Sequence, residues 1–238
     1  MKRLISLFLI FLSFCGKSEP EIIINIDYKG AFEVVLSFEY KNIDYVDSVV
    51  IKRNQGEYSP EFFVFYGSIN KFRDTTVSPD FSYNYNIKVF GSDDVSGNIS
   101  VKTGNPSNYY MIVSPLYLET DKDFPVNLEI YNVNNLFGVS GRLLFNSSIL
   151  KVDSIKKGSI WDADDVLFNL IKGDTIIFAI TKQRGENSIT GSGKILKVYF
   201  SKLSSGTLYI QPFEIWISDE NGSYIPNPEI RGSYIKVR

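Results

Sequence analysis

The segment Phe32-Glu33-Val34-Val35-Leu36-Ser37-Phe38-Glu39-Tyr40 decides the fold class, because every even-numbered position in it is apolar. Side chains alternate between the two faces of a β-strand, so this pattern gives the strand one apolar face. The same alternation recurs at 83–89, 124–130 and 196–200. Nowhere does the sequence sustain the apolar spacing of three and four residues that marks an amphipathic helix. We therefore expect an all-β protein.

Short turn-forming segments rich in glycine, proline, serine, asparagine and aspartate separate the expected strands. They fall at 54–56, 78–80, 91–94, 172–174, 204–206 and 220–222. Many short strands at this spacing favour β-sandwiches or barrels. The segment Gly104-Asn105-Pro106-Ser107-Asn108 lies between two strand-rich halves and is interpreted as a linker, 104–108. The sequence thus predicts two β-sandwich domains, 21–103 and 109–238.

The composition excludes several classes of function. The chain has 238 residues, no histidine and one cysteine, so it cannot carry a Ser-His-Asp triad, a histidine-containing zinc site or an intrachain disulfide. With 25 basic and 27 acidic residues, the net charge of -2 gives no basic footprint for nucleic acid. Aromatic residues make up 15% of the chain, which favours strands. We expect no enzyme and no cofactor.

The first fifteen residues have the pattern of an export signal. A positive start, Lys2 and Arg3, precedes eleven uncharged residues at 4–14, too short a run to cross a membrane as a helix. The segment Leu12-Ser13-Phe14-Cys15 resembles the lipobox of bacterial lipoproteins, although a small residue is expected in place of Phe14. The resemblance implies lipidation of Cys15, a tether at 16–20 and anchoring to the cell envelope or surface. An ordinary secretory signal that is cut a few residues later is the alternative.

The first half resembles a fibronectin type III domain over 21–103. The resemblance is carried by Phe72-Arg73-Asp74-Thr75-Thr76-Val77-Ser78-Pro79, followed by Phe81-Ser82-Tyr83-Asn84-Tyr85-Asn86-Ile87-Lys88-Val89. It implies that Tyr83 is the tyrosine corner, whose hydroxyl bonds to upstream backbone. It also implies that Phe38 fills the core where the family has tryptophan. Such domains act as spacers or interaction modules. We expect the aromatic run at 62–66 to be a core strand between the two sheets.

The second half resembles a cohesin domain, through several segments that occur in the family's order. They are 124–133, 137–152, 157–159, 192–200, 219–226 and 232–237. Phe145-Asn146-Ser147 stands where the family has Tyr-Asp-Pro. Cohesins bind dockerins, often on polysaccharide-degrading enzymes, through one face of the sandwich and perform no catalysis. A carbohydrate-binding sandwich of the jelly-roll type is the nearest alternative.

The cohesin resemblance also implies where a partner would bind. The contact positions fall at Ser140, Arg142, Ile171 and Gln183. Asparagine or aspartate is typical at the first of these positions and an acidic residue at the last, so this chain has lost much of the family's hydrogen-bonding pattern. The alternative is that all four are ordinary exposed strand residues.

Carboxylates and tryptophans provide the remaining candidate sites. The aspartates of the Trp161-Asp162-Ala163-Asp164-Asp165 segment can ligate calcium through oxygen, but the segment lacks the EF-hand pattern, so a solvated loop is favoured and no metal is expected. Trp161 and Trp216 are candidates for stacking on sugar rings. Trp216 lies between Ile215 and Ile217 in an alternating segment, so it should point away from the core if those two point into it.

Taken together, these patterns predict an exported, non-catalytic surface lipoprotein whose second domain binds or scaffolds a protein. The cohesin resemblance implies that this protein is carbohydrate-active. The first alternative is direct binding of polysaccharide or cell-wall carbohydrate. The second is a structural envelope or adhesion protein.

Overall fold

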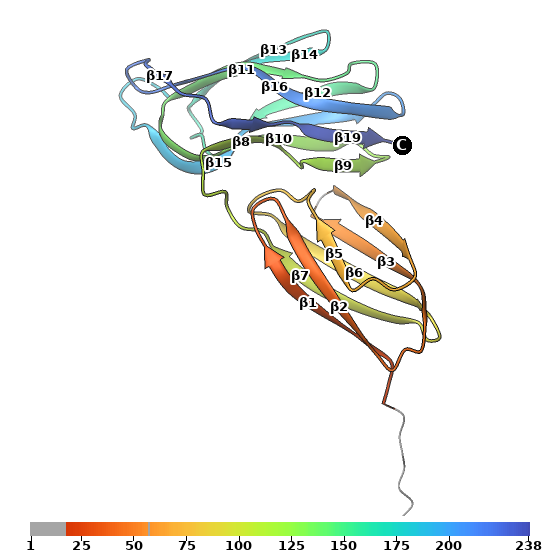
Figure 1. The fold of residues 1–238 in the computed structure, drawn as a ribbon. Coiled ribbons are helices and arrows are strands. Elements are labelled where there is room, and N and C mark those ends of the chain that lie inside the picture. Colours follow the sequence, from red (N-terminus) through yellow and green to blue (C-terminus); the bar gives the residue numbers. More distant parts are fainter. Residues whose placement is uncertain (1–17, 57) are drawn as a thin grey trace, which may run out of the picture.

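The computed structural model describes residues 18–56 and 58–238, and every regular element in these ranges is a β-strand. Figure 1 shows the strands gathered in two bodies that are joined by one connection. The all-β prediction is confirmed. The predicted signal segment and Cys15 lie outside the described residues. No helix in the described ranges is long and apolar enough to cross a membrane.

The N-terminal domain consists of two sheets. Its strands are β1 (Glu21–Lys29), β2 (Val34–Lys41), β3 (Val46–Gln55), β4 (Tyr58–Tyr66), β5 (Lys71–Asp74), β6 (Ser82–Gly91) and β7 (Val95–Lys102). One sheet has the order β1-β2-β5 and the other β4-β3-β6-β7. Every other residue of β2 and β6 points into the core, as the alternation predicts. These buried residues are Val34, Leu36, Phe38, Tyr83, Tyr85, Ile87 and Val89.

The aromatic run at 62–66 departs from the expectation of a core strand. It lies in β4, at the edge of its sheet, and only Phe63 and Phe65 pack against the core. Phe62, Val64 and Tyr66 are exposed. An uninterrupted apolar run suggests burial on both faces, but each strand of a two-layer sandwich has only one face toward the core.

A charged cluster lies inside this domain. Arg53 on β3 has no exposed surface and contacts Asp74 at 2.5 Å and Glu61 at 2.7 Å. Its guanidinium also lies over the rings of Phe63 and Tyr83. The neighbouring carboxylates raise the pKa of Arg53 even though burial opposes its charge. Two carboxylates therefore pair the two terminal nitrogens of the buried cation, whereas its Nε has no hydrogen-bond partner among the described residues.

The C-terminal domain is a larger sandwich. Its strands are β8 (Tyr110–Ser114), β9 (Tyr117–Thr120), β10 (Phe124–Leu136), β11 (Gly138–Leu144), β12 (Leu150–Lys157), β13 (Val166–Lys172), β14 (Thr175–Thr181), β15 (Ile189–Lys202), β16 (Gly206–Ser218), β17 (Tyr224–Ile225), β18 (Glu229–Arg231) and β19 (Ser233–Val237). One sheet has the order β12-β15-β10-β8-β18. The other has the order β13-β14-β11-β16-β19-β9, with β17 paired to β16.

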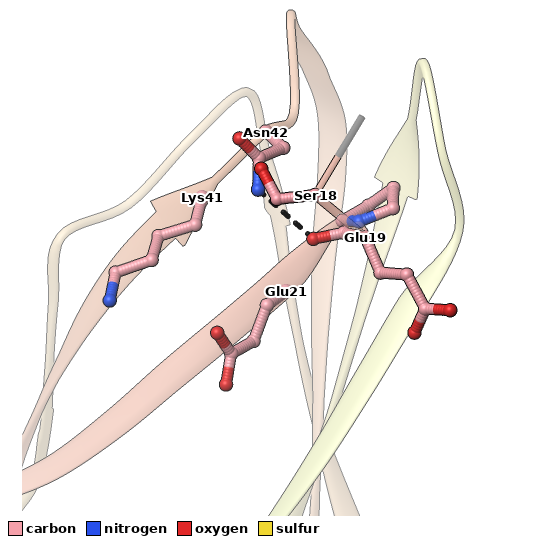
Figure 2. Close-up of a pocket in the computed structure, with 6 residues that line it drawn as sticks. Ser18, Glu19, Glu21, Lys41 and Asn42 are labelled. Atoms are coloured by element: carbon pink, nitrogen blue, oxygen red, sulfur yellow. Dashed lines mark hydrogen bonds between the residues drawn. The ribbon is translucent and has the colours of Figure 1, made fainter. Parts of the chain in front are cut away.

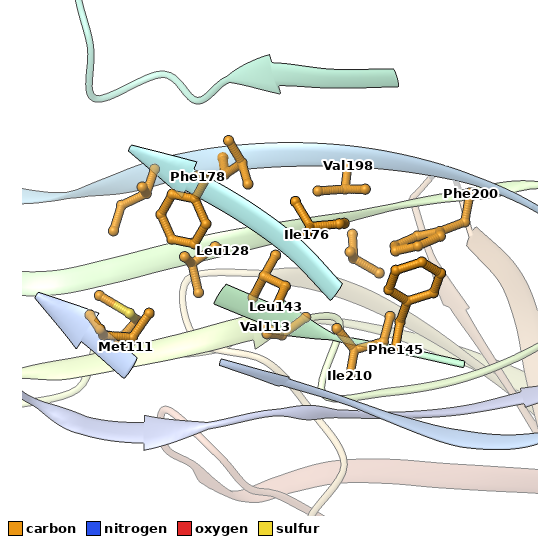
Figure 3. Packing of buried hydrophobic residues seen from close by; sticks show 14 of the residues in the cluster. Met111, Val113, Leu128, Leu143, Phe145, Ile176, Phe178, Val198, Phe200 and Ile210 are labelled. Carbon is orange, nitrogen blue, oxygen red and sulfur yellow. The ribbon is translucent and has the colours of Figure 1, made fainter. Parts of the chain in front are cut away.

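The two sheets enclose one apolar core, part of which Figure 3 shows. Leu128 on β10 and Val198 on β15 come from the first sheet, and Leu143 on β11 and Phe178 on β14 come from the second. All four are essentially inaccessible to solvent. Burial of apolar side chains from both sheets is the main force that holds the layers together.

The N-terminal domain covers part of the five-stranded sheet. The outward side chains of β10, Asn127, Glu129 and Tyr131, are buried, because residues of the first domain pack on them. The Tyr131 hydroxyl lies 3.4 Å from the carbonyl oxygen of Pro79, and Tyr58 packs with the core cluster of the C-terminal domain. In Figure 1, strands β13, β14 and β11 lie on the side away from the first domain. The part of the seven-stranded sheet formed by β13, β14 and β11 therefore keeps a free outer face, whereas its edge strand β9 contacts β4 of the first domain.

Candidate binding face

The free face is built from cross-strand rows of side chains on β13, β14, β11 and β16. Residues directly opposite each other in an antiparallel ladder point to the same face. One row runs Phe168, Ala179, Ser140, Trp216, and the next runs Leu170, Ile177, Arg142, Phe213. Together with Val166 and Tyr224, these residues define what we call the distal face.

Large apolar side chains are exposed on the distal face. Phe168 has 58% of its surface exposed and Trp216 has 54%, and Val166, Leu170 and Phe213 are also exposed. Single exposed apolar residues are ordinary, but contiguous ones mark interaction surfaces. Val166, Phe168 and Leu170 are neighbours on edge strand β13, whereas Phe213 and Trp216 lie on β16. Strands β14 and β11 separate the two groups, and Ala179 and Ile177 on β14 continue the apolar surface from β13.

Two aromatic rings meet at one end of this face. The centroids of Trp216 and Tyr224 lie 4.6 Å apart, and their planes are inclined at 42°. The inclined pair presents a ridge and not a flat platform. The two rings therefore do not form one coplanar platform for a sugar ring.

A charged pair interrupts the apolar rows. Arg142 Nε lies 3.0 Å from Glu214 Oε2, with both side chains about half exposed. Glu214 has a φ of 50°, and the register between β11 and β16 shifts between Ser140 and Arg142. These are the features of a β-bulge, which redirects a side chain at the cost of one ladder pair. The bulge brings the Glu214 carboxylate to Arg142.

The four contact residues implied by the sequence do not all share this face. Ser140 and Arg142 lie in its centre. Ile171 is opposite Ile176, which is buried, so it points to the inner side of edge strand β13 and is exposed only because the strand is at the edge. Gln183 lies in the loop after β14, where its side-chain amide donates to the carbonyl of Asp164 at 2.9 Å.

Sequence reasoning missed the strongest apolar members of the face. Phe168, Leu170 and Phe213 are exposed there, whereas only Trp216 was singled out for an outward orientation. The β13 segment is apolar at both odd and even positions, so alternation gives no direction for it. The register with β14 supplies that direction.

The two tryptophans have different environments. Trp216 points outward, away from buried Ile215 and Ile217. Trp161 is only 7% exposed, and its indole N–H donates to the carbonyl of Ile195 at 3.0 Å. The expectation that Trp161 stacks on a sugar is therefore corrected, since its ring faces are covered by the core.

A charged network joins the 158–165 loop to the end of β14. Lys182 is buried, and its ammonium contacts Asp162 at 2.9 Å, Glu186 at 3.3 Å and Asp165 at 3.6 Å. The hydrogen bond and the charge of Lys182 lower the pKa of Asp162, and the same hydrogen bond raises the pKa of Lys182. The residues in this part of the chain that could hold a metal ion are Asp164, Asp165 and Glu186.

Two concave regions lie elsewhere. Figure 2 shows one at the start of β1, where Asn42 donates to the carbonyl of Glu19 at 3.0 Å and the lining side chains are charged or polar. The other, of about 550 Å³, lies between the domains and is lined by residues that include Phe81, Glu129 and Lys194. Burial raises the pKa of Glu129, which accepts a hydrogen bond from Tyr131 at 2.6 Å.

No family model matches this chain, and no curated protein sequence matches it. Cohesins are among the solved structures that match. A non-cellulosomal cohesin from the archaeon Archaeoglobus fulgidus is 18% identical, with 56% of this chain and 92% of that chain covered and a TM-score of 0.48. A type I cohesin–dockerin complex from Clostridium thermocellum gives 17% identity, 58% and 98% coverage and a TM-score of 0.48. A type II cohesin from the cellulosome of Acetivibrio cellulolyticus is 13% identical, with 54% of this chain and 94% of that chain covered and a TM-score of 0.45.

The strands, sheets and surfaces themselves define the class. The chain is an all-β protein with two sandwich domains. The first packs on the five-stranded sheet and against edge strand β9 of the second, and the seven-stranded sheet exposes apolar side chains on the outer side of β13 and β16.

Proposed function

We propose that this chain is a non-catalytic binding protein whose distal face holds a separate folded protein. The observation that carries the proposal is the exposure of large apolar side chains on one face of the sheet, Phe168 and Leu170 on β13 and Trp216 on β16. Interface centres in protein complexes are depleted in charge and enriched in aromatic residues. The resemblance of 124–237 to cohesin sequence segments supports the same kind of partner.

The position of the distal face supports a role for the first domain in presenting this face to a partner. The N-terminal domain packs on the opposite sheet and contacts β10 through Tyr58 and Pro79. This arrangement leaves the distal face unobstructed by the chain's own described residues. We propose that the first domain, which resembles a fibronectin type III domain, is a spacer and that Cys15 is the lipid attachment point of an exported chain.

The partner we propose is a protein with an apolar patch of its own. The central charged pair, Arg142 and Glu214, satisfies itself at 3.0 Å, so the face carries little unpaired charge for a strongly ionic ligand. A carbohydrate-active partner is what the cohesin resemblance implies. Direct carbohydrate binding and self-association are the outcomes against which the proposal is tested.

Site-specific photo-crosslinking in the source organism tests the proposal. A photoreactive phenylalanine analogue at position 168 should capture one protein, whereas the same analogue at position 62 should not. Phe62 is a matched control, because it is 57% exposed, close to Phe168, but lies on the first domain. Capture of a second copy of the chain from position 168 would indicate self-association. Retention on a glycan array that is lost on Trp216→Ala would indicate carbohydrate binding.

A further inference from the structure

The 158–165 loop is only partly the solvated loop that the sequence favours, because residues 162–164 are exposed but two of its other residues are not. Trp161 and Asp165 are buried, and Asp165 has no exposed side-chain surface. One carboxylate oxygen from each of Asp164, Asp165 and Glu186 lies within 4.8 Å of the other two. Three oxygens at this separation can contact one cation of calcium size together.

One buried oxygen in this cluster has no partner. Asp165 Oδ2 accepts the backbone N–H of Asp162 at 2.7 Å and faces Lys182, whereas Asp165 Oδ1 has no hydrogen-bond partner among the described residues. An unsatisfied buried carboxylate oxygen is costly, because it has lost its water without replacement. Lys182 does not satisfy it, since its nearest contacts are with Asp162 and Glu186.

The loop is already arranged around positive charge. The Lys157 ammonium donates to three backbone carbonyls, those of Asp162, Ala163 and Asp165, at 2.7, 2.8 and 2.5 Å. These three hydrogen bonds hold the backbone of the loop in place. The Asp164 side chain is exposed, and its backbone carbonyl accepts a hydrogen bond from the side chain of Gln183.

The net charge of the cluster can accommodate a divalent cation. Four carboxylates, those of Asp162, Asp164, Asp165 and Glu186, meet two ammonium groups, those of Lys157 and Lys182. Arg184 lies in the same loop but forms no ion pair with them in the described structure. Two negative charges remain, which equals the charge of one calcium ion.

We propose that Asp164, Asp165 and Glu186 bind a calcium ion, with Asp165 Oδ1 as the buried ligand. Hard oxygen ligands with flexible spacing suit calcium better than magnesium, which demands a near-ideal octahedron. The site lies between the start of β13 and the end of β14, beside the distal face. The proposal concerns the metal site itself and does not depend on the identity of any protein partner.

Calorimetric titration of the full chain, freed of divalent ions by chelation, tests the site. Calcium should bind at one site with a Kd of about 10⁻⁴–10⁻³ M, the range of weak extracellular modules, and magnesium about tenfold or more weakly. Terbium, which takes the same oxygen ligands, should give luminescence sensitised by Trp161 in a Trp216→Phe background, and calcium should displace it. Asp164→Asn should abolish both signals.

Asp121→Asn is the matched control, because Asp121 is an exposed turn carboxylate outside the cluster, and it should leave calcium binding unchanged. Absence of calcium heat and of displaceable terbium emission up to about 10 mM would overturn the proposal. So would wild-type calcium affinity in Asp164→Asn. Because Asp164 is exposed and its side chain has no hydrogen bond in the described structure, the variant should fold normally, which its thermal unfolding curve checks.

Discussion

Trp216 and Tyr224 pack against each other on the distal face, with ring centroids 4.6 Å apart. Trp216 comes from β16, and Tyr224 comes from the short strand β17 that pairs with it. Both rings remain about half exposed, so they pack against each other without being buried by the rest of the protein. A rigid, exposed aromatic pair loses little side-chain entropy when a partner binds.

Trp216→Ala should weaken binding of the protein partner by about 2 kcal/mol or more, roughly thirtyfold in Kd, because exposed tryptophans that become buried are typical interface hot spots. The melting temperature should change little, since the ring is not part of the core. Isothermal titration against the captured partner measures the first effect. An unchanged Kd would remove Trp216 from the binding face.

Arg53→Met should destabilise the N-terminal domain by about 3–5 kcal/mol, because it leaves Asp74 and Glu61 buried without their cation. Urea denaturation measures the change. Arg73→Met is the matched control, because the Arg73–Glu33 pair lies at the surface and should contribute little. Equal midpoints for the two variants would contradict a structural role for the buried cluster.

Tyr83→Phe should destabilise the same domain by about 1–3 kcal/mol. The Tyr83 hydroxyl accepts the buried backbone N–H of Ser78 at 2.6 Å, so its removal leaves that donor unsatisfied. Burial raises the pKa of Tyr83 to about 12, so the hydroxyl stays protonated at all ordinary pH values. A urea midpoint equal to that of the wild type would mean that water replaces the hydroxyl at no cost.

Glu129→Gln should stabilise the chain at neutral pH. Burial raises the pKa of Glu129 in the folded state. The protonated carboxyl therefore contributes to folding stability below the unfolded pKa, near 4.5, and this contribution is lost as the pH rises through the pKa of the folded state. Glutamine can still accept the Tyr131 hydroxyl without a charge. Urea midpoints should therefore differ more at pH 7 than at pH 4. A larger difference at pH 4 would contradict the upward shift of the Glu129 pKa in the folded state.

Alternation of apolar and polar residues was enough to predict the strands whose two faces differ. At 124–130 the apolar positions are buried in the C-terminal core, as expected. The same rule could not orient β13, where Phe168 and Ile171 are both apolar and only the pairing with β14 separates their faces. It also misplaced Phe62, because the sequence does not show which strand is at the edge of a sheet.

The acidic loop shows another limit of sequence reasoning. Lys182 is distant in the sequence from Asp162, and the hairpin of β13 and β14 brings the two together. Nothing in the local sequence indicates that Asp165 is buried with an oxygen left without a partner. That feature depends on the packing of the whole loop around Trp161 and Lys157.

The dissociation constant of the Phe168→Asp chain for the partner captured at position 168 tests the central claim most directly. A carboxylate in place of an exposed phenylalanine in an apolar interface should weaken binding about thirtyfold or more, whereas Phe62→Asp should leave it within about twofold of the wild type. Equal affinity for wild type and Phe168→Asp, with both chains folded, would contradict the proposal that the distal face binds a protein.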